Sequence, residues 1–353
     1  MRAVKSIEIP MAAATLVLLA CSLACSTETV ARPPPPPVNW QAFNHAPADA
    51  GLATPTAKES TLAQDYLAAL ASPASPASPA FDQLAPLLDA DAHLSFPGMD
   101  DAHDRDGVLR AHATLFGAFE QRRFVASRIW RTASEQTVEW TMSGAQNSAW
   151  MGVPRTHKPI AIKGVTLLWT NDDGTIADAH VYFDVAVAKA MLGAGPKELT
   201  GLPAPAVPPL PPPPQIVDAS PLGPDQTAVV RAALDALENG DESAFDAQMT
   251  DDVEVHALDR ASATIGKDAQ AAYFKALRKA IAQLDATVEN AWTAGAFAIV
   301  EYSLAGEQLG PIGWVPLQRD RVVKEHVVDV DEMRDGKIAR VWRFANPNEL
   351  VGP

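Results

Sequence analysis

The chain is poor in cysteine and in basic residues. Only two of its 353 residues are cysteine, Cys21 and Cys25, and both lie near the N-terminus. The rest of the chain can therefore hold no disulfide framework, no thiolate zinc site and no cysteine nucleophile. The 28 Lys and Arg residues are scattered among 43 Asp and Glu residues, without the basic patch that nucleic-acid phosphates require. We therefore expect no nucleic-acid partner.

Long apolar runs are also missing, since no stretch reaches the roughly 18 residues of a membrane-spanning helix. A short apolar run at residues 11–20 follows Arg2 and Lys5, which is typical of a signal peptide covering residues 1–25. Residues 18–21, Leu-Leu-Ala-Cys, resemble a bacterial lipoprotein box. We therefore expect a lipid on Cys21, with Cys25 as the alternative, and a protein anchored to the cell envelope by this lipid alone. If neither cysteine is lipidated, the protein is secreted.

Proline is abundant but clustered. The 30 prolines include runs at residues 33–37 and 211–214. Proline interrupts helices and central strands, so these regions cannot form a packed core. We predict a tether at residues 26–59 and a semi-rigid linker at residues 195–224.

Two parts of the chain repeat each other at an offset of 162 residues. Residues 138–146 read VEWTMSGAQ, and residues 300–308 read VEYSLAGEQ. The same offset joins further pairs, Trp130 with Trp292, Val165 with Val327, and the Asp-Gly turns at 173–174 and 335–336. A register held over almost fifty residues indicates a tandem duplication, with domains at 60–194 and 225–347.

Each copy shows helical periodicity first and strand patterns afterwards. In the first copy we predict helices near 60–70, 81–88 and 107–119, and strands near 123–132, 136–146, 159–170 and 174–184. In the second copy the helices are expected near 225–239, 243–249 and 267–282, and the strands near 285–293, 297–307, 321–333 and 336–345. Three helices before a curved antiparallel meander predict an α+β, cone-shaped domain in each copy. The open mouth of such a cone suits a small apolar ligand.

A family resemblance rests on the first copy. Its sequence contains GVPRTHKP at 152–159, IKGV at 162–165, DGTI at 173–176 and HVYFD at 180–184. This order resembles the SnoaL-like polyketide cyclases of the nuclear transport factor 2-like superfamily, and the second copy resembles them more weakly. The superfamily holds cyclases, dehydratases, isomerases and many binding domains, so the resemblance implies a fold and not one activity.

The polar row on the last strand of the first copy carries the candidate catalytic residues. Asp178, His180, Tyr182 and Asp184 are spaced two apart and share one face of the strand. If this face looks into the cone, Asp184 is a general base, His180 its partner, and Tyr182 a hydrogen-bond donor to a carbonyl. The resemblance supports the role of Asp184. In the alternative interpretation Asp184 caps the segment that follows, and His180 is a structural histidine.

The second copy has lost this row, because the offset places Trp342, Phe344 and Asn346 at the equivalent positions. We therefore interpret it as degenerate. The candidate ligand-binding residues of the two copies are Trp140, Gln146, Trp150, His157, Trp342 and Phe344. No cofactor and no metal site are expected. Glu325, His326 and Asp329 could be imagined as metal ligands, but a solvated acidic edge is the favoured interpretation.

Glu139 and Glu301 occupy equivalent positions, which favours a structural role such as pairing across the sheet. The two domains are expected to pack as an intramolecular pseudo-dimer. Three functions stay open at this point: a non-catalytic envelope protein that binds a small apolar or carbonyl-containing molecule, an acid–base enzyme that uses Asp184 and His180, and a scaffold for partner proteins.

Overall fold

The computed structural model describes residues 61–72, 81–219, 225–318 and 321–351. All of them belong to one unit of the chain, Val38–Pro353. The expected signal peptide and tether, with Cys21 and Cys25, lie outside the described residues. Among the helices that are described, none is both long and apolar enough to cross a membrane.

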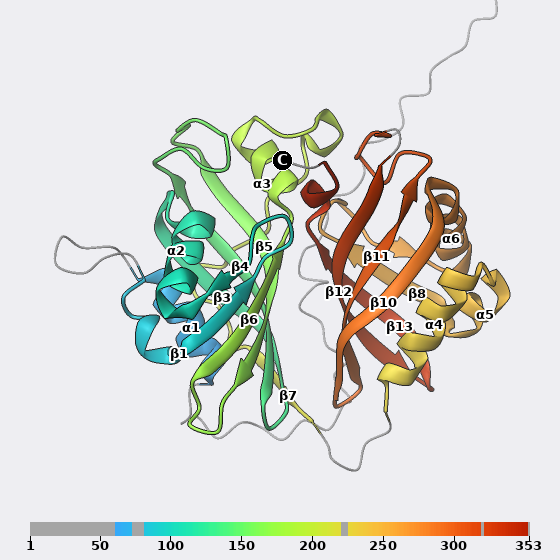
Figure 1. The fold of residues 1–353 in the computed structure, drawn as a ribbon, viewed down its shortest axis with the longest axis horizontal. Coiled ribbons are helices and arrows are strands. Elements are labelled where there is room, and N and C mark those ends of the chain that lie inside the picture. The colour runs from blue at the N-terminus through green and yellow to red at the C-terminus, as the bar shows by residue number, and fades with distance from the viewer. Residues whose placement is uncertain (1–60, 73–80, 220–224, 319–320, 352–353) are drawn as a thin grey trace, which may run out of the picture. The chain divides into compact units, whose positions relative to one another are not determined.

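The first domain covers one face of a seven-stranded sheet with helices (Figure 1). Its strands lie in the order β2-β1-β6-β5-β4-β3-β7. In chain order the elements are α1 (Leu62–Ala71), β1 (Leu88–Ser95), β2 (Ala102–His103), α2 (Asp104–Phe116), β3 (Phe119–Arg131), β4 (Glu135–Gln146), β5 (Pro159–Thr170), β6 (Ile176–Phe183), α3 (Val185–Leu192) and β7 (Gln215–Asp218).

The second domain repeats this plan with a six-stranded sheet in the order β10-β11-β12-β13-β8-β9. Its elements are α4 (Thr227–Asn239), α5 (Glu242–Ala247), β8 (Met249–Ala257), β9 (Thr264–Ile265), α6 (Lys267–Ala280), β10 (Ile281–Ala294), β11 (Phe297–Gln308), β12 (Val322–Arg334), β13 (Lys337–Ala345) and a short 3₁₀ turn, Pro347–Val351. The predicted α+β class with two tandem cone domains is confirmed.

The expected helix at 81–88 is wrong. Only a 3₁₀ turn forms at Ala85–Leu87, and strand β1 follows directly. Leu88, Ala92 and Leu94 are its buried residues, and their even spacing is that of a strand with one buried face. Strand β1 pairs in parallel with β6, as β8 does with β13, so the sheets are mixed and not wholly antiparallel.

The proline-rich linker is more than a spacer. After the last proline of its 211–214 run, strand β7 joins the edge of the first sheet in parallel with β3. An edge is where a strand that follows prolines can pair. Helix α3 was not expected either. It begins at the N-cap Asp184 and ends at Gly193, whose φ of 88° is in the left-handed region that favours glycine.

The repeat register slips by one residue in the third long strand. Trp140 pairs with Gly164, while its equivalent Tyr302 pairs with Val327, so the offset there is 163. The expected equivalence of Val165 and Val327 is therefore wrong, because a shift of one residue turns a side chain to the other face of the sheet. In β6 and β13 the offset returns to 162, since the opposite residues Leu167 and Val330 pair with His180 and Trp342.

The two faces of each sheet have different partners. The inner face of each sheet packs against its own helices and forms the core of that domain. The outer faces share a third buried cluster, to which the first domain contributes Trp130, Leu167 and Tyr182, and the second Phe297 and Trp342. Figure 1 shows β5 and β6 facing β12 and β13, with α1 and α2 on one far side and α4, α5 and α6 on the other.

Gly164 gives a test of the first core. A Cβ at this position would lie 2.4 Å from Trp140 Cζ2 and 2.6 Å from the Tyr182 carbonyl oxygen. We expect Gly164→Ala to lower the free energy of unfolding by about 1–3 kcal/mol through overpacking, as measured by urea denaturation. The control is Gly107→Ala in α2, where the nearest atom lies 3.4 Å away and alanine favours the helix. Equal losses in both variants would contradict the expectation.

Candidate functional site

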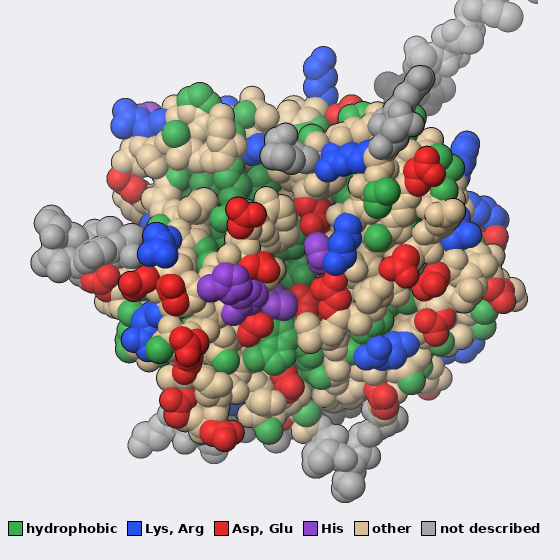
Figure 2. Space-filling model, in the orientation of Figure 1, with side chains coloured by type: hydrophobic (Ala, Val, Ile, Leu, Met, Phe, Trp, Pro, Cys, Tyr) green, Lys and Arg blue, Asp and Glu red, His purple; other side chains and the backbone are tan. Residues whose placement is uncertain are grey.

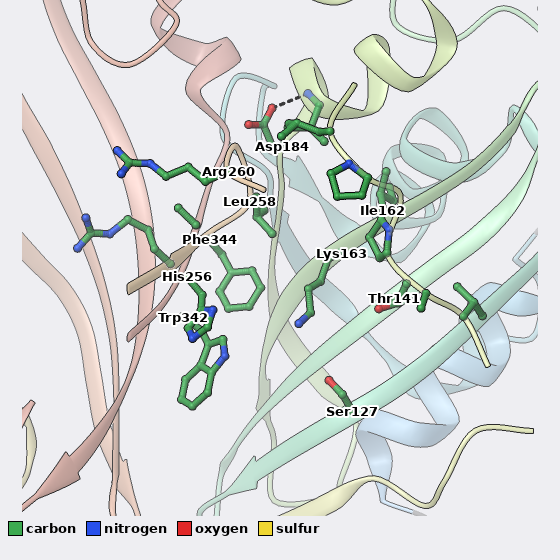
Figure 3. Close-up of a pocket in the computed structure, with 18 of the residues that line it drawn as sticks. Ser127, Thr141, Ile162, Lys163, Asp184, His256, Leu258, Arg260, Trp342 and Phe344 are labelled. Atoms are coloured by element: carbon green, nitrogen blue, oxygen red, sulfur yellow. Dashed lines mark hydrogen bonds between the residues drawn. The ribbon is translucent and has the colours of Figure 1, made fainter. Parts of the chain in front are cut away.

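A cavity of about 730 Å³ lies between the outer sheet faces of the two domains (Figure 3). Both domains contribute polar and apolar side chains to its wall, and the aromatic ones, His256, Trp342 and Phe344, come from the second domain. The proline-rich linker closes one side. The wall residues used below are Thr141, Lys163 and Asp184 from the first domain, Leu202, Pro205 and Val207 from the linker, and His256, Trp342 and Phe344 from the second domain. This volume can hold a drug-sized molecule.

A buried charge cluster stands behind the first wall. Glu139 has no solvent exposure and lies 2.7 Å from Arg128 Nε and 2.5 Å from Lys163 Nζ. Burial alone would raise the pKa of Glu139, but the two cations outweigh it and hold the pKa well below its ordinary range. The cluster therefore carries one net positive charge, and Lys163 presents it to the cavity. As expected for Glu139, these partners lie on neighbouring strands of the same sheet.

The opposite wall is aromatic. Trp342 stacks on His256 with ring centroids 5.9 Å apart and 10° between the planes. On its other side the Arg128 guanidinium lies 3.6 Å from the Trp342 ring centroid, a cation–π contact across the domain interface. Burial lowers the pKa of His256. His256 and Arg128 thus already pack against the Trp342 ring, and Leu258 and Phe344 supply further apolar surface to this wall.

Asp184 lies where the wall meets helix α3. Its Oδ1 accepts the backbone N–H groups of Ala186 and Val187, 2.7 and 3.0 Å away. Its Oδ2 is buried without a hydrogen-bond partner among the described residues. Burial raises the pKa of Asp184 to about 7. Asp184 therefore caps helix α3, as the alternative interpretation expects. It is also a carboxyl group at a cavity wall that can hold a proton near neutral pH.

His180 and Tyr182 do not face the interior of the cone. His180 Nδ1 and the Tyr182 hydroxyl each lie 2.6 Å from Glu301 Oε1 of the second domain. His180 Nε2 lies 3.4 Å from Asp178 Oδ2, so only the protonated ring donates to both carboxylates. Burial would lower the pKa of His180, but these carboxylates raise it to about 10. No hydrogen bond or ion pair among the described residues joins His180 to Asp184, so the expected catalytic pair is not assembled.

The interior of the second domain holds a second cavity, of about 260 Å³. Its wall includes Gln270, Tyr273, Trp314 and Glu325, and Asp184 of the first domain closes one side. Burial, followed by the Glu349 carboxylate, raises the pKa of Glu325 to about 8. Two carboxyl groups that hold protons near neutral pH thus border one small space.

A buried ion pair reaches the wall of this cavity through Arg343, which also lines the larger cavity. Arg343 donates two hydrogen bonds to Asp329, at 2.9 and 2.7 Å, and the Tyr302 hydroxyl donates a third at 3.0 Å. Neighbouring Asp331 is also buried, and burial together with Asp329 raises its pKa well above the ordinary value. The expected solvated acidic edge on this strand is therefore wrong.

The first domain has apolar or neutral residues at the equivalent interior positions. Trp140 replaces Tyr302, and Trp140 Nε1 donates to Thr166, which stands where the second domain has Asp329. Val181 stands in place of Arg343. The domain interpreted as degenerate is thus the one whose interior keeps ionisable groups.

A profile of the SnoaL-like domain matches residues 63–179 and 230–341, which together make up well over half of the chain. The chain belongs to the SnoaL-like domain family. Each match covers most of one SnoaL-like domain as the strands define it. A comparison with curated protein sequences found no match.

Solved structures share the SnoaL-like fold at low identity. A protein described as a SnoaL-like polyketide cyclase from Jannaschia is 19% identical, covering 33% of this chain and 79% of its own, with a TM-score of 0.31. TsrD from Streptomyces laurentii is 19% identical (35% and 90% covered, TM-score 0.32). An LEH-like epoxide hydrolase from M. tuberculosis is 20% identical (36% and 86% covered, TM-score 0.30). At this level the likeness concerns the fold of one SnoaL-like domain and implies no activity.

The other expected ligand-binding residues divide into two groups. Trp342 and Phe344 line the larger cavity. Trp140 and Trp150 are buried in the core of the first SnoaL-like domain, and Gln146 Nε2 donates to the Val153 and Pro154 carbonyl oxygens of its own loop. His157 is exposed on that loop. No described contact brings this second group to either cavity.

Several site residues were missed in the sequence. Lys163 and His256 alternate with apolar residues along their strands. This pattern predicts a solvent-exposed outer face of a sheet and gives no indication of a cavity. Nothing in the proline-rich sequence of the linker indicated that residues such as Pro205 line the larger cavity. Glu325 was missed because the gapless offset of 162 did not show the one-residue register slip, which places Glu325 at the position of Ile162 on the inner face of the strand.

The charge on Asp184 gives a pH-dependent prediction. The folded protein keeps this proton up to about pH 7, whereas the ordinary pKa is 3.8. The resulting stabilisation is complete below pH 4 and is lost as the pH rises toward 7. Asparagine keeps the cap without the charge. The free energy of unfolding of Asp184→Asn, relative to that of the wild type, should therefore be roughly 1–4 kcal/mol higher at pH 8 than at pH 4. Urea denaturation at both pH values measures this.

The second domain supplies the control. Asn346, at the equivalent position, accepts the Val185 N–H and donates to the Pro97 carbonyl oxygen. Asn346→Asp should therefore lose stability, and should lose more at pH 8 than at pH 4. A pH-independent difference for Asp184→Asn would refute the raised pKa.

Proposed function

We propose that the protein binds a small, mainly apolar molecule with a carbonyl or carboxylate oxygen in the cavity between its two SnoaL-like domains. The observation that carries the proposal is the 730 Å³ space itself, which both domains and the linker enclose. A space of this size with mostly apolar walls and few polar groups is typical of a ligand site.

The charge distribution supports the choice of ligand. Lys163 and the aromatic residues Trp342 and Phe344 lie on opposite walls, as Figure 3 shows. An apolar part of the ligand can pack against Leu258 and Phe344 on this wall. An acceptor oxygen can take a hydrogen bond from Lys163, whose cluster with Arg128 and Glu139 has one positive charge in excess.

Native mass spectrometry tests this function. We expect the protein, purified without detergent, to carry or capture a ligand of a few hundred daltons that denaturation releases. Thr141→Phe, which places an aromatic ring in the larger cavity, should lower occupancy at least about tenfold. Ala276→Phe is the matched control, because Ala276 lines only the smaller of these two cavities. Equal occupancy in Thr141→Phe and the wild type would exclude the site.

A second candidate function is acid–base catalysis in the smaller cavity. It is favoured by one observation, the presence of Glu325 and Asp184 on the wall of the same 260 Å³ space, beside Tyr273 and Gln270. A carboxyl group with a pKa near 8 can remove a proton next to a carbonyl group once it is ionised. In this form the enzyme hypothesis retains Asp184 and replaces His180 by Glu325.

Proton exchange in D₂O tests this candidate. We expect small ketones to exchange their α-protons at a rate that rises with pH through about 8, as Glu325 ionises. Glu325→Gln should lower the rate at least about 100-fold, as followed by NMR. The exposed Glu307→Gln serves as the control. Exchange that is unchanged in Glu325→Gln argues against catalysis at this site.

The cellular setting is also a proposal. We propose a lipid on Cys21 or Cys25 that anchors the protein to the cell envelope, with the two SnoaL-like domains acting as an intramolecular pseudo-dimer. The contacts of Glu301 with His180 and Tyr182 support the pseudo-dimer. A scaffold role for partner proteins stays a prediction.

A further inference from the structure

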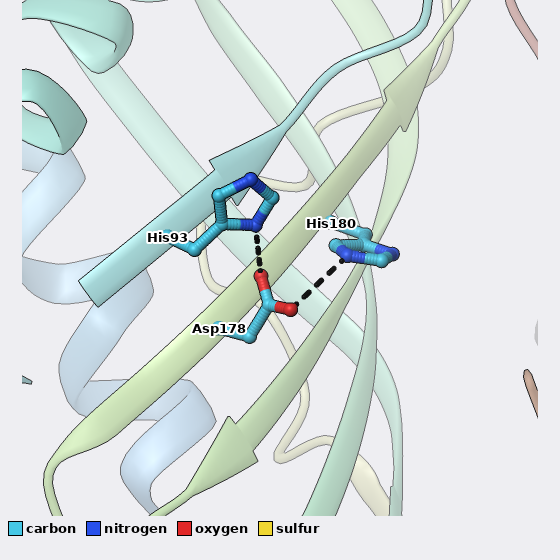
Figure 4. A group of neighbouring side chains, drawn as sticks. All are labelled: His93, Asp178 and His180. Carbon is cyan, nitrogen blue, oxygen red and sulfur yellow. Dashed lines mark hydrogen bonds and ion pairs between the residues drawn. The ribbon is translucent and has the colours of Figure 1, made fainter. Parts of the chain in front are cut away.

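We propose that His93, Asp178 and His180 form a binding site for a transition-metal ion of the zinc class (Figure 4). One potential ligand atom from each residue lies within 4.8 Å of the other two. None of these residues lines the cavities described above. The site is thus independent of the proposed ligand and catalytic functions.

Strand pairing brings the three residues together. β1 runs parallel to β6, and His93 pairs with Asp178 across the two strands. Asp178 and His180 are two residues apart, so their side chains leave the same face of β6. The side chains of His93, Asp178 and His180 are 26%, 36% and 16% exposed, so an ion can reach them from solvent.

The distances fit a small metal ion. Asp178 lies between the two histidines, with Oδ1 2.9 Å from His93 Nδ1 and Oδ2 3.4 Å from His180 Nε2. Ligand atoms about 2.0–2.1 Å from a tetrahedral zinc ion lie about 3.3 Å from one another. One ligand atom from each residue lies within 4.8 Å of the other two, so the atoms must approach one another by at most about 1.5 Å for an ion to replace the protons that now join these groups.

Glu301 supplies the outer support that metal-binding histidines usually have. Its buried carboxylate accepts the Nδ1–H of His180 at 2.6 Å, which directs Nε2 toward Asp178. Tyr182 and Asn290 donate to the same carboxylate, at 2.6 and 2.5 Å, and fix its orientation. Such a carboxylate sets the tautomer of a ligating histidine and strengthens it as a ligand. Because Glu301 belongs to the second domain, metal binding is coupled to the domain interface.

Further polar groups lie beside His93. Asp101 Oδ2 lies 3.6 Å from His93 Nε2, the ring nitrogen that does not face Asp178, and can therefore orient the ring. The His103 ring lies 4.9 Å from the His93 ring. Figure 2 shows histidine and acidic side chains grouped on this face of the molecule. Two imidazoles with a carboxylate suit zinc, copper, nickel or iron(II), whereas magnesium and calcium prefer an all-oxygen shell.

The second domain provides an internal comparison. The equivalents of Asp178 and His180 are Arg340 and Trp342, and Glu254 stands opposite Arg340 as His93 stands opposite Asp178. Arg340 Nε lies 3.1 Å from Glu254 Oε2, a simple ion pair. The same backbone position thus has a cationic side chain in one domain and potential ligands in the other.

Metal titration of the untagged chain, with its two cysteines alkylated, tests the proposal. We expect one Zn²⁺ per chain by equilibrium dialysis at pH 7, and visible absorption bands when Co²⁺ is used in its place. His93→Gln and Asp178→Asn should each weaken binding at least 100-fold, and Glu301→Gln 10- to 100-fold. Glu254→Gln, the matched change in the second domain, should leave the affinity unchanged. Thermal unfolding of each variant shows whether it is folded.

Two outcomes would overturn the site. One is a wild-type protein that takes up no stoichiometric Zn²⁺ or Co²⁺ at micromolar concentration. The other is binding that persists unchanged in both His93→Gln and Asp178→Asn. Loss of binding in these two variants together with retention in Glu254→Gln supports it.

Discussion

A buried glutamate at the same position of each domain, Glu139 in β4 and Glu301 in β11, governs how the outer sheet faces meet. An ionised carboxylate without solvent is strongly unfavourable unless it is fully paired. Glu139 finds Arg128 and Lys163 within its own sheet. Glu301 instead takes hydrogen bonds from His180 and Tyr182 of the other domain. The duplicated residue is thus satisfied in two different ways.

This difference explains where the cavity and the histidine cluster lie. On the Glu301 side, His180 and Tyr182 fill the contact, and the Asp178 carboxylate next to His180 brings in His93. On the Glu139 side, the second domain has Trp342 and Phe344 at the positions of His180 and Tyr182. The faces of these rings cannot donate a hydrogen bond to a carboxylate. They form an aromatic wall opposite Lys163, and the space between becomes the larger cavity.

The interiors of the two domains differ as well. The second domain has more charged groups inside, whereas on the outer face the first domain has the polar residues His180 and Tyr182. The first interior is packed with aromatic rings, with Phe116, Trp140 and Phe183 centroids 5.7–6.1 Å apart. The second retains the Arg343–Asp329 pair, Asp331 and Glu325. The first interior also holds His112, which is fully buried and lies 2.6 Å from the Tyr66 hydroxyl. Burial lowers the pKa of His112 to about 4, so this ring is neutral and the first interior has no charge to pair.

The sequence by itself determined the duplication, the α+β class, the long strands and the family, because these follow from periodicity and from short-range repetition. It also determined that positions 180 and 342 correspond, since the turn and strand offsets there agree. The tertiary structure alone decided which face of the sheet is inside. The one-residue slip between β5 and β12 reverses every side chain and reveals Asp329 and Glu325 as interior residues. It alone brought His93 to Asp178 and the linker prolines over the cavity, because contacts between distant segments have no local signal in the chain.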